Sequence, residues 1–202
     1  MTINYFGKDC IRVQGNGSSI LFNPLDSSLG LKPMRMQNDV IIYSQVPDKN
    51  VQKENAFVIT SPGEYEIGGI FIYGLLKNGG LGDNTIFILE YEGLRLAHLG
   101  NLQQTKFNDS QLEKLQGIDV LIVPVGGGDA LDAKQAVEIT SQLEPRVVIP
   151  VNYDLPGLKI KLDSVDKFKK EIGASFEKLD KLKVVKKDLL EEDTRFVLLE
   201  AT

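Results

Sequence analysis

Asp119-Val120-Leu121-Ile122-Val123 is a compact apolar run with an acidic start, followed by the glycine-rich loop 126–129 and a helical pattern. A short apolar run of this kind is typical of a buried strand. From Asp132, apolar residues recur at three- and four-residue spacing, which predicts an amphipathic helix that Pro145 ends. Residues 146–149 form the next apolar run. Strand, helix and strand in this order predict sheets covered by helices.

The segments on either side of this unit extend the pattern. Gly15-Asn16-Gly17 and Glu92-Gly93 contain residues that tolerate positive φ, as hairpin turns require. Asn108, with Gln111 three residues later, has the spacing of a helix capping box, and Asp163 opens a further helical pattern. The predicted strands are residues 10–14, 18–22, 39–43, 56–60, 70–73, 85–89, 94–98, 119–123, 146–149 and 195–199. Because no low-complexity linker interrupts them, we predict a single domain over residues 1–202.

The composition excludes several classes of protein. A net charge of -5 and a pI of about 5.0 argue against a whole-surface nucleic-acid binder, which would be basic. Cys10 is the single cysteine and forms no internal disulfide, and no apolar run approaches the ~20 residues of a membrane span. We therefore expect a cytoplasmic protein that binds neither nucleic acid nor membrane. His98 is the single histidine, whereas zinc and redox-metal sites usually take about three or four imidazole or thiolate ligands.

Several segments, taken in chain order, resemble the metallo-β-lactamase fold, in its branch of small UlaG-like metal-dependent hydrolases. The most specific is Ser-Pro-Gly-Glu-Tyr-Glu-Ile-Gly-Gly at 61–69, which is similar to the Pro-Gly-Glu-Tyr-Glu stretch of that branch. Residues 96–102 resemble its His-Leu-Gly-Asp-Leu, residues 119–127 its Asp-Val-Leu-Leu-Val-Pro-Val-Gly-Gly, and residues 149–153 its Ile-Pro-Met-His-Tyr. The resemblance implies an α/β fold, a four-layer αββα sandwich, with a metal-dependent hydrolase site.

The sequence departs from that family at the metal ligands. After the strand that ends at Ser44 the family has His-x-His-x-Asp-His, whereas this chain has Gln45-Val46-Pro47-Asp48-Lys49-Asn50. Asn101 stands where the family has its bridging aspartate, and Asn152 where it has its last histidine. His98 matches a histidine that is not a ligand in the family. Amide oxygens are neutral and suit zinc poorly.

Without a metal, no bound water is brought to a pKa near 7, and the family's hydrolytic mechanism has no nucleophile. We therefore expect no zinc and no other cofactor, and interpret the chain as a non-catalytic binding or scaffold module. Its partner is an unidentified small molecule or protein, and a homo-oligomer is left open. The alternative is a hydrolase-like enzyme with an altered or metal-free site, so whether the chain is an enzyme stays open.

Each candidate residue also has a plain structural interpretation. The degenerate site comprises Gln45, Asp48, Asn50, His98, Asn101 and Asn152. Its amides form either a repurposed binding site or a retired one in which they bond to each other and to water. His98 is either a general base or a hydrogen-bonded structural histidine. The loop Gly126, Gly127, Gly128 and Asp129 could offer backbone N–H groups to a phosphate or carboxylate, or could simply join strand to helix.

Overall fold

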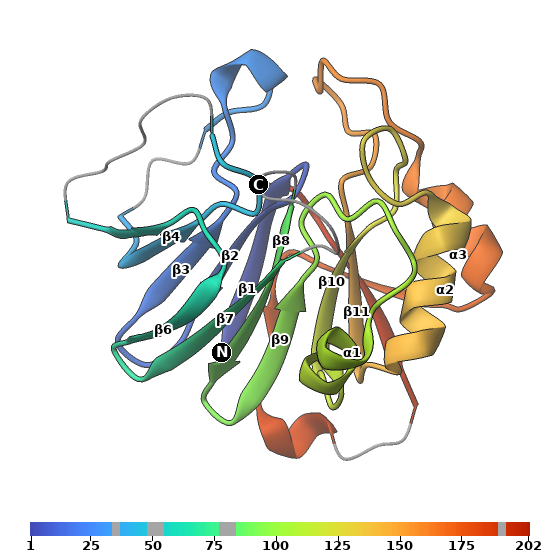
Figure 1. Ribbon diagram of the computed structural model, residues 1–202. Coiled ribbons are helices and arrows are strands. Elements are labelled where there is room, and N and C mark those ends of the chain that lie inside the picture. The colour runs from blue at the N-terminus through green and yellow to red at the C-terminus, as the bar shows by residue number, and fades with distance from the viewer. Residues whose placement is uncertain (34–36, 48–54, 77–83, 190–192) are drawn as a thin grey trace.

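The computed structural model describes residues 1–33, 37–47, 55–76, 84–189 and 193–202, and within them two β-sheets pack face to face (Figure 1). The first sheet has the order β13-β1-β2-β3-β4-β5. Its strands are β1 (Thr2–Gly7), β2 (Cys10–Gln14), β3 (Ser19–Phe22), β4 (Val40–Ile42), β5 (Phe57–Ile59) and β13 (Leu182–Lys183). Strands β13, β1, β2 and β3 pair antiparallel, and β3, β4 and β5 pair parallel.

The second sheet has the order β12-β14-β11-β10-β9-β8-β7-β6 in the described part of the chain. Its strands are β6 (Gly63–Ile67), β7 (Ile70–Leu76), β8 (Thr85–Tyr91), β9 (Leu94–His98), β10 (Val120–Pro124), β11 (Val147–Val151), β12 (Phe176–Leu179) and β14 (Arg195–Leu199). Strands β6 to β9 form an antiparallel meander, whereas β9, β10, β11, β14 and β12 run parallel. This parallel half places several strand ends at one edge of the sandwich.

Helices cover the eight-stranded sheet on the side that faces away from the other sheet (Figure 1). They are α1 (Asp109–Leu115), α2 (Ala133–Leu143) and α3 (Val165–Ile172), and the short 3-10 helices are η1 (Ser27–Leu29) and η2 (Lys186–Leu189). The N-cap side chains of Asn108 and Asp132 each complete a capping box, with Gln111 and Gln135, as their spacing predicts. In the described residues, η1 and the segment around it cover the outer face of the six-stranded sheet, where Cys10, Leu21 and Leu25 form a small apolar cluster.

One large apolar cluster lies between the sheets and draws residues from both. Ile3, Tyr5 and Phe22 of the six-stranded sheet and Phe87 and Ile122 of the eight-stranded sheet are fully buried in it. Burial of this kind is the dominant favourable term in folding. The predicted α/β sandwich is therefore confirmed. Among the described residues, no helix is long and apolar enough to cross a membrane.

Four of the described strands are absent from the sequence prediction: β1, β6, β12 and β13. In β1, Ile3 and Tyr5 are buried while Thr2, Asn4 and Phe6 are partly exposed, the alternation of a strand with one buried face. In β6, the exposed Glu64 and Glu66 alternate with half-buried residues in the same way. Short polar-apolar alternations give a weaker signal than the continuous apolar runs of β8 or β10. The Glu64 carboxylate of β6 lies 3.1 Å from the Lys114 ammonium on α1.

Candidate site at the carboxyl ends of the parallel strands

The candidate residues after β9, β10 and β11 lie at one edge of the eight-stranded sheet. Ile122 of β10 is opposite His98 of β9, and Pro124 of β10 is opposite Val151 of β11. Because these strands are parallel, their carboxyl ends share an edge, which is where α/β proteins commonly bind ligands. Asn101 follows β9, the 126–129 loop follows β10, and Asn152 follows β11 at this edge. We call Gln45, Asn101 and Asn152 the strand-end amides.

The turn between β1 and β2 ties the other sheet to this edge. The backbone N–H of Asn152 donates to Lys8 O at 2.5 Å. The Nε2 atom of His98 lies 3.0 Å from Asp9 O. Both contacts join backbone of the six-stranded sheet to residues that follow or end parallel strands of the other sheet. The sequence permits this sharp reversal because Gly7 has a φ of 105°, which glycine adopts readily, and Lys8 follows it with a φ of 51°.

Asn101 is held on two sides by amide side chains. Its backbone N–H donates to Asn84 Oδ1 at 2.8 Å, and its Nδ2 donates to Gln45 Oε1 at 2.9 Å. Asn84 is itself buried and donates from Nδ2 to Leu99 O at 2.9 Å, so its side chain spans the loop that carries Asn101. The Oδ1 atom of Asn101 is buried and accepts no hydrogen bond from any described residue. The contact of Asn101 with Gln45 brings together residues 56 positions apart in the sequence.

Asn152 presents a second buried acceptor. The residue is 3% exposed, and its Oδ1 atom has no hydrogen-bond partner in the described part of the chain. Its backbone is left-handed, with φ of 54°, a conformation that asparagine tolerates better than most residues. Gly126 approaches it closely, since a Cβ added at Gly126 would lie 2.2 Å from Asn152 O. A buried, unpaired polar group costs about 1–3 kcal/mol.

A second set of polar residues positions Gln45. The N–H of Ser44 donates to Asn23 Oδ1 at 2.7 Å, and Ser44 O accepts from the N–H of Thr85 at 2.7 Å. Asn23 also donates from Nδ2 to Asp9 Oδ2 at 2.7 Å. Gly100 packs against this set, because a Cβ there would lie 2.5 Å from Ser44 Cβ. The ends of β3 and β4 are thereby fixed to the start of β8 and to the β1–β2 turn.

His98 has the contacts of a structural histidine. It is fully buried, and its ring stacks on Phe22 with centroids 4.7 Å apart and planes inclined by 14°. Its Nδ1 accepts from the N–H of Gly100 at 3.0 Å, so Nε2 carries the proton and donates to Asp9 O. Burial lowers the pKa of His98 below its ordinary value of 6.5, with the nearby Asp9 opposing the shift. Both ring nitrogens are thus used in structural hydrogen bonds, which join the end of β9 to the β1–β2 turn and to Gly100.

In the 126–129 loop, backbone groups of Gly127 are bonded within the connection to α2. The N–H of Gly127 donates to Leu131 O at 3.0 Å, and the N–H of Ala130 lies 3.3 Å from Gly127 O. Gly127 and Gly128 have φ of 68° and 69°, which allows the tight path into α2. Asp129 is exposed, and its carbonyl accepts from Gln103 Nε2. These contacts support the connection of strand to helix, and binding of an anion by this loop stays a prediction.

The structure brings Gln45 and Asn101 into contact and places His98 and Asn152 at the same edge. Asp48 and Asn50 lie outside the described residues. Sequence reasoning missed Asn84 and Ser44 as parts of the site. The available signal was position: Asn84 comes directly before an apolar strand, and Ser44 directly after one. The sequence does not show that these residues lie near Asn101.

Zinc, which the resemblance implies for this edge, does not fit the described side chains. Among the residues that the structure describes, no three His, Cys, Asp or Glu side chains gather where they could hold a metal ion. The polar groups at the edge are amides, whose neutral oxygens bind zinc weakly, and Gln45 Oε1 already accepts from Asn101. His98 could become a ligand only by losing its contact with Gly100 or Asp9. The absence of zinc stays a prediction.

Comparison with known proteins places this geometry in a family. The family model of the beta-lactamase superfamily domain matches residues 2–152. A UPF0173 metal-dependent hydrolase of Natranaerobius thermophilus is 24% identical over 85% of this chain and 91% of its own length. A UPF0173 metal-dependent hydrolase of Pyrococcus abyssi is 30% identical over 61% of this chain and 54% of its own length.

A crystal structure from Thermotoga maritima extends the match to almost the whole chain. That protein, described as a candidate Zn-dependent hydrolase of the metallo-beta-lactamase superfamily, is 31% identical, with a TM-score of 0.82 over 98% of this chain and 97% of its own. The family model covers most of the present chain and the structural match covers nearly all of it. The chain therefore belongs to the beta-lactamase superfamily and has the metallo-β-lactamase fold.

Proposed function

We propose that this chain is a non-catalytic member of the superfamily that binds a small molecule through the strand-end amides. The observation that carries the proposal is the pair of buried acceptors, Asn101 Oδ1 and Asn152 Oδ1, neither of which has a partner among the described residues. Both stand at positions where the family resemblance implies metal ligands.

The chemistry of these two atoms indicates what the ligand offers. Amide oxygens only accept hydrogen bonds, and one of the two N–H donors on Asn101 Nδ2 is already given to Gln45. A ligand that presents N–H or O–H groups would remove the cost of leaving the two oxygens unpaired. Each neutral hydrogen bond formed in this way contributes about 0.5–1.5 kcal/mol net. Amines, amides, guanidines and alcohols are therefore the expected ligand classes.

The same residues leave hydrolysis without its usual agents. Amides do not ionise in the ordinary pH range, so Asn101, Asn152 and Gln45 cannot act as general bases. His98 is fully buried and uses both ring nitrogens in structural contacts. Nothing among these four side chains can generate a hydroxide or bind a catalytic metal strongly.

The second candidate is a hydrolase with an altered or metal-free site. The Natranaerobius and Thermotoga proteins are described as hydrolases, which favours this candidate, since the Thermotoga protein matches nearly the whole chain. The two candidates differ in a measurable way, because only the second requires turnover.

A thermal-shift screen with amines, amides, guanidines and alcohols tests the first candidate. A ligand at about 100 times its Kd stabilises the native state by about 2.7 kcal/mol. The shift should be lost in Asn101→Ala and in Asn152→Gly, the latter chosen because glycine accepts the left-handed backbone at this position. The exposed Gln142 on α2 provides a matched control, and Gln142→Ala should keep the full shift.

An activity assay separates the two candidates. The first predicts no hydrolysis of a phosphodiester or lactone above background, with or without added zinc. Turnover that chelator removes and zinc restores would contradict the first candidate and support the second. Turnover that is insensitive to chelator but lost in Asn101→Ala would support a metal-free enzyme.

A further inference from the structure

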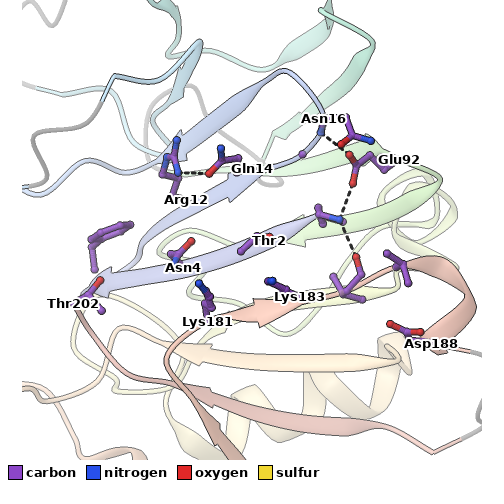
Figure 2. Close-up of a pocket in the computed structure, with 15 residues that line it drawn as sticks. Thr2, Asn4, Arg12, Gln14, Asn16, Glu92, Lys181, Lys183, Asp188 and Thr202 are labelled. Atoms are coloured by element: carbon purple, nitrogen blue, oxygen red, sulfur yellow. Dashed lines mark hydrogen bonds and ion pairs between the residues drawn. The ribbon is translucent and has the colours of Figure 1, made fainter.

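A groove lies on the outer face of the six-stranded sheet, beside the strands β13, β1 and β2. Its volume is about 840 Å³, within the range of roughly 300–1,000 Å³ that small-molecule sites occupy. Thr2 and Asn4 of β1 form its floor, as Figure 2 shows. The groove includes the start of β1, whereas the strand-end amides lie at the edge beyond the other end of that strand, where Lys8 and Asp9 form the turn.

Positive side chains stand on both sides of this floor. Thr2 is opposite Lys183 of β13 on one side, and Asn4 is opposite Arg12 of β2 on the other. Lys181 lies beside Lys183 at the same rim (Figure 2). Adjacent strands are about 4.8 Å apart, so β13 and β2 are separated by roughly 10 Å. The groove therefore offers two separate cationic positions with a polar floor between them.

Lys181 and Lys183 are not paired with carboxylates in the described part of the chain, whereas Arg12 interacts electrostatically with the Asp39 carboxylate. Lys181 and Lys183 are exposed and take part in none of the ion pairs between described residues. Arg12 gives its side-chain hydrogen bonds to the neutral amides of Asn38 at 2.9 Å and Gln14 at 2.6 Å. A guanidinium has five N–H donors, so donors remain for a ligand.

The acidic residues of the groove do not cancel this charge. The Glu92 carboxylate is engaged by the amino group of Met1 at 2.7 Å and by the N–H of Asn16 at 2.6 Å. The other carboxylates of the lining are Asp188 and the α-carboxylate of Thr202, the last residue of the sequence. Lys181, Lys183 and Arg12 are thus three cations against these two carboxylates, in a chain whose net charge is -5.

We propose that this groove binds a small molecule with two anionic groups, phosphates or carboxylates. One group would be bound by Lys181 and Lys183, and the other by Arg12. Thr2 and Asn4 on the floor would hydrogen-bond to the polar part of the ligand between them. Phe6 and Val185, which also line the groove, supply apolar surface next to the charges.

Pyrophosphate is the probe for a ligand with phosphate groups, and tricarballylate is the probe for a ligand with carboxylate groups. Binding is measured by calorimetry and by thermal shift on the full chain, at matched ionic strength with chloride as the reference salt. The double variant Lys181→Gln/Lys183→Gln should weaken the Kd of at least one probe about tenfold. The matched control is Lys178→Gln/Lys187→Gln, which removes the same charge from exposed lysines outside the groove lining.

The outcomes distinguish specific binding from general charge attraction. The proposal predicts saturable binding that the control double variant retains and the groove double variant loses, with both variants melting near the wild type without probe. A response to one probe alone identifies the anionic group. Equal weakening in both double variants would overturn the proposal, because net charge would then explain the effect. Failure of both probes to bind the wild type saturably would overturn it as well.

Discussion

Replacing Asn84 with alanine tests whether its side chain organises the loop that carries Asn101. The amide accepts from the Asn101 N–H at 2.8 Å and donates to Leu99 O at 2.9 Å, and all three residues are buried. Asn84→Ala removes both bonds and leaves two buried backbone groups unpaired. An unsatisfied buried group costs about 1–3 kcal/mol, so the free energy of unfolding should fall by about 3 kcal/mol. For a chain of this size each kcal/mol lowers the Tm by roughly 2–4 °C.

Urea unfolding measures the loss directly, and Gln142→Ala, an exposed helix position, is the reference that should change stability by less than about 0.5 kcal/mol. Hydrogen exchange adds a local readout, because the Asn101 amide should exchange faster in Asn84→Ala than in the wild type. A loss of less than about 1 kcal/mol, together with unchanged exchange at Asn101, would refute the role assigned to Asn84.

Three further perturbations probe the same edge. Burial lowers the pKa of His98 below 6.5, so on acidification the imidazole takes up a proton in the unfolded chain before it does so in the folded one. The stability that the neutral, buried His98 contributes is therefore full above about pH 6.5 and falls as the pH drops below that value. The pH dependence of urea unfolding between about pH 7 and 5 should therefore be flatter in His98→Gln. Gly100→Ala puts a Cβ 2.4 Å from Asn84 Oδ1 at a φ of 58° and should cost about 3 kcal/mol in thermal or urea unfolding. Asn152→Ala should be about 1 kcal/mol less stable than Asn152→Gly by the same measurement, because its φ is 54°.

Local signals in the sequence were enough to predict most of the secondary structure. The capping boxes at Asn108 and Asp132 depend on residues three positions apart, and the structure forms both. The Glu92-Gly93 turn joins β8 to β9 as a tight hairpin, with φ of 53° and 73°. Family resemblance, rather than any local signal, supplied the two-sheet architecture, and the comparisons confirm it. The UlaG-like branch and the single-domain organisation stay predictions.

The geometry of the candidate site depended on contacts that sequence spacing does not encode. Asn101 meets Gln45 across 56 positions, and His98 meets Asp9 across 89. Sequence alone could place Asn101 and Asn152 after two strands, which the structure shows on either side of β10, but could not show that each side chain keeps an unpaired oxygen among the described residues. The polar support from Asn84 was missed for the same reason. The pairing of β1 with β13, which builds the groove, joins the two ends of the chain and has no local signature.

Metal analysis of protein purified without chelator tests the central claim most directly. Elemental analysis is combined with zinc titration calorimetry on the same sample. The amide character of Gln45, Asn101 and Asn152 predicts a substoichiometric content of transition metal and no tight zinc binding. One equivalent of a transition metal, located beside Asn101 by anomalous scattering, would contradict the account and restore the metal-dependent hydrolase as the leading function.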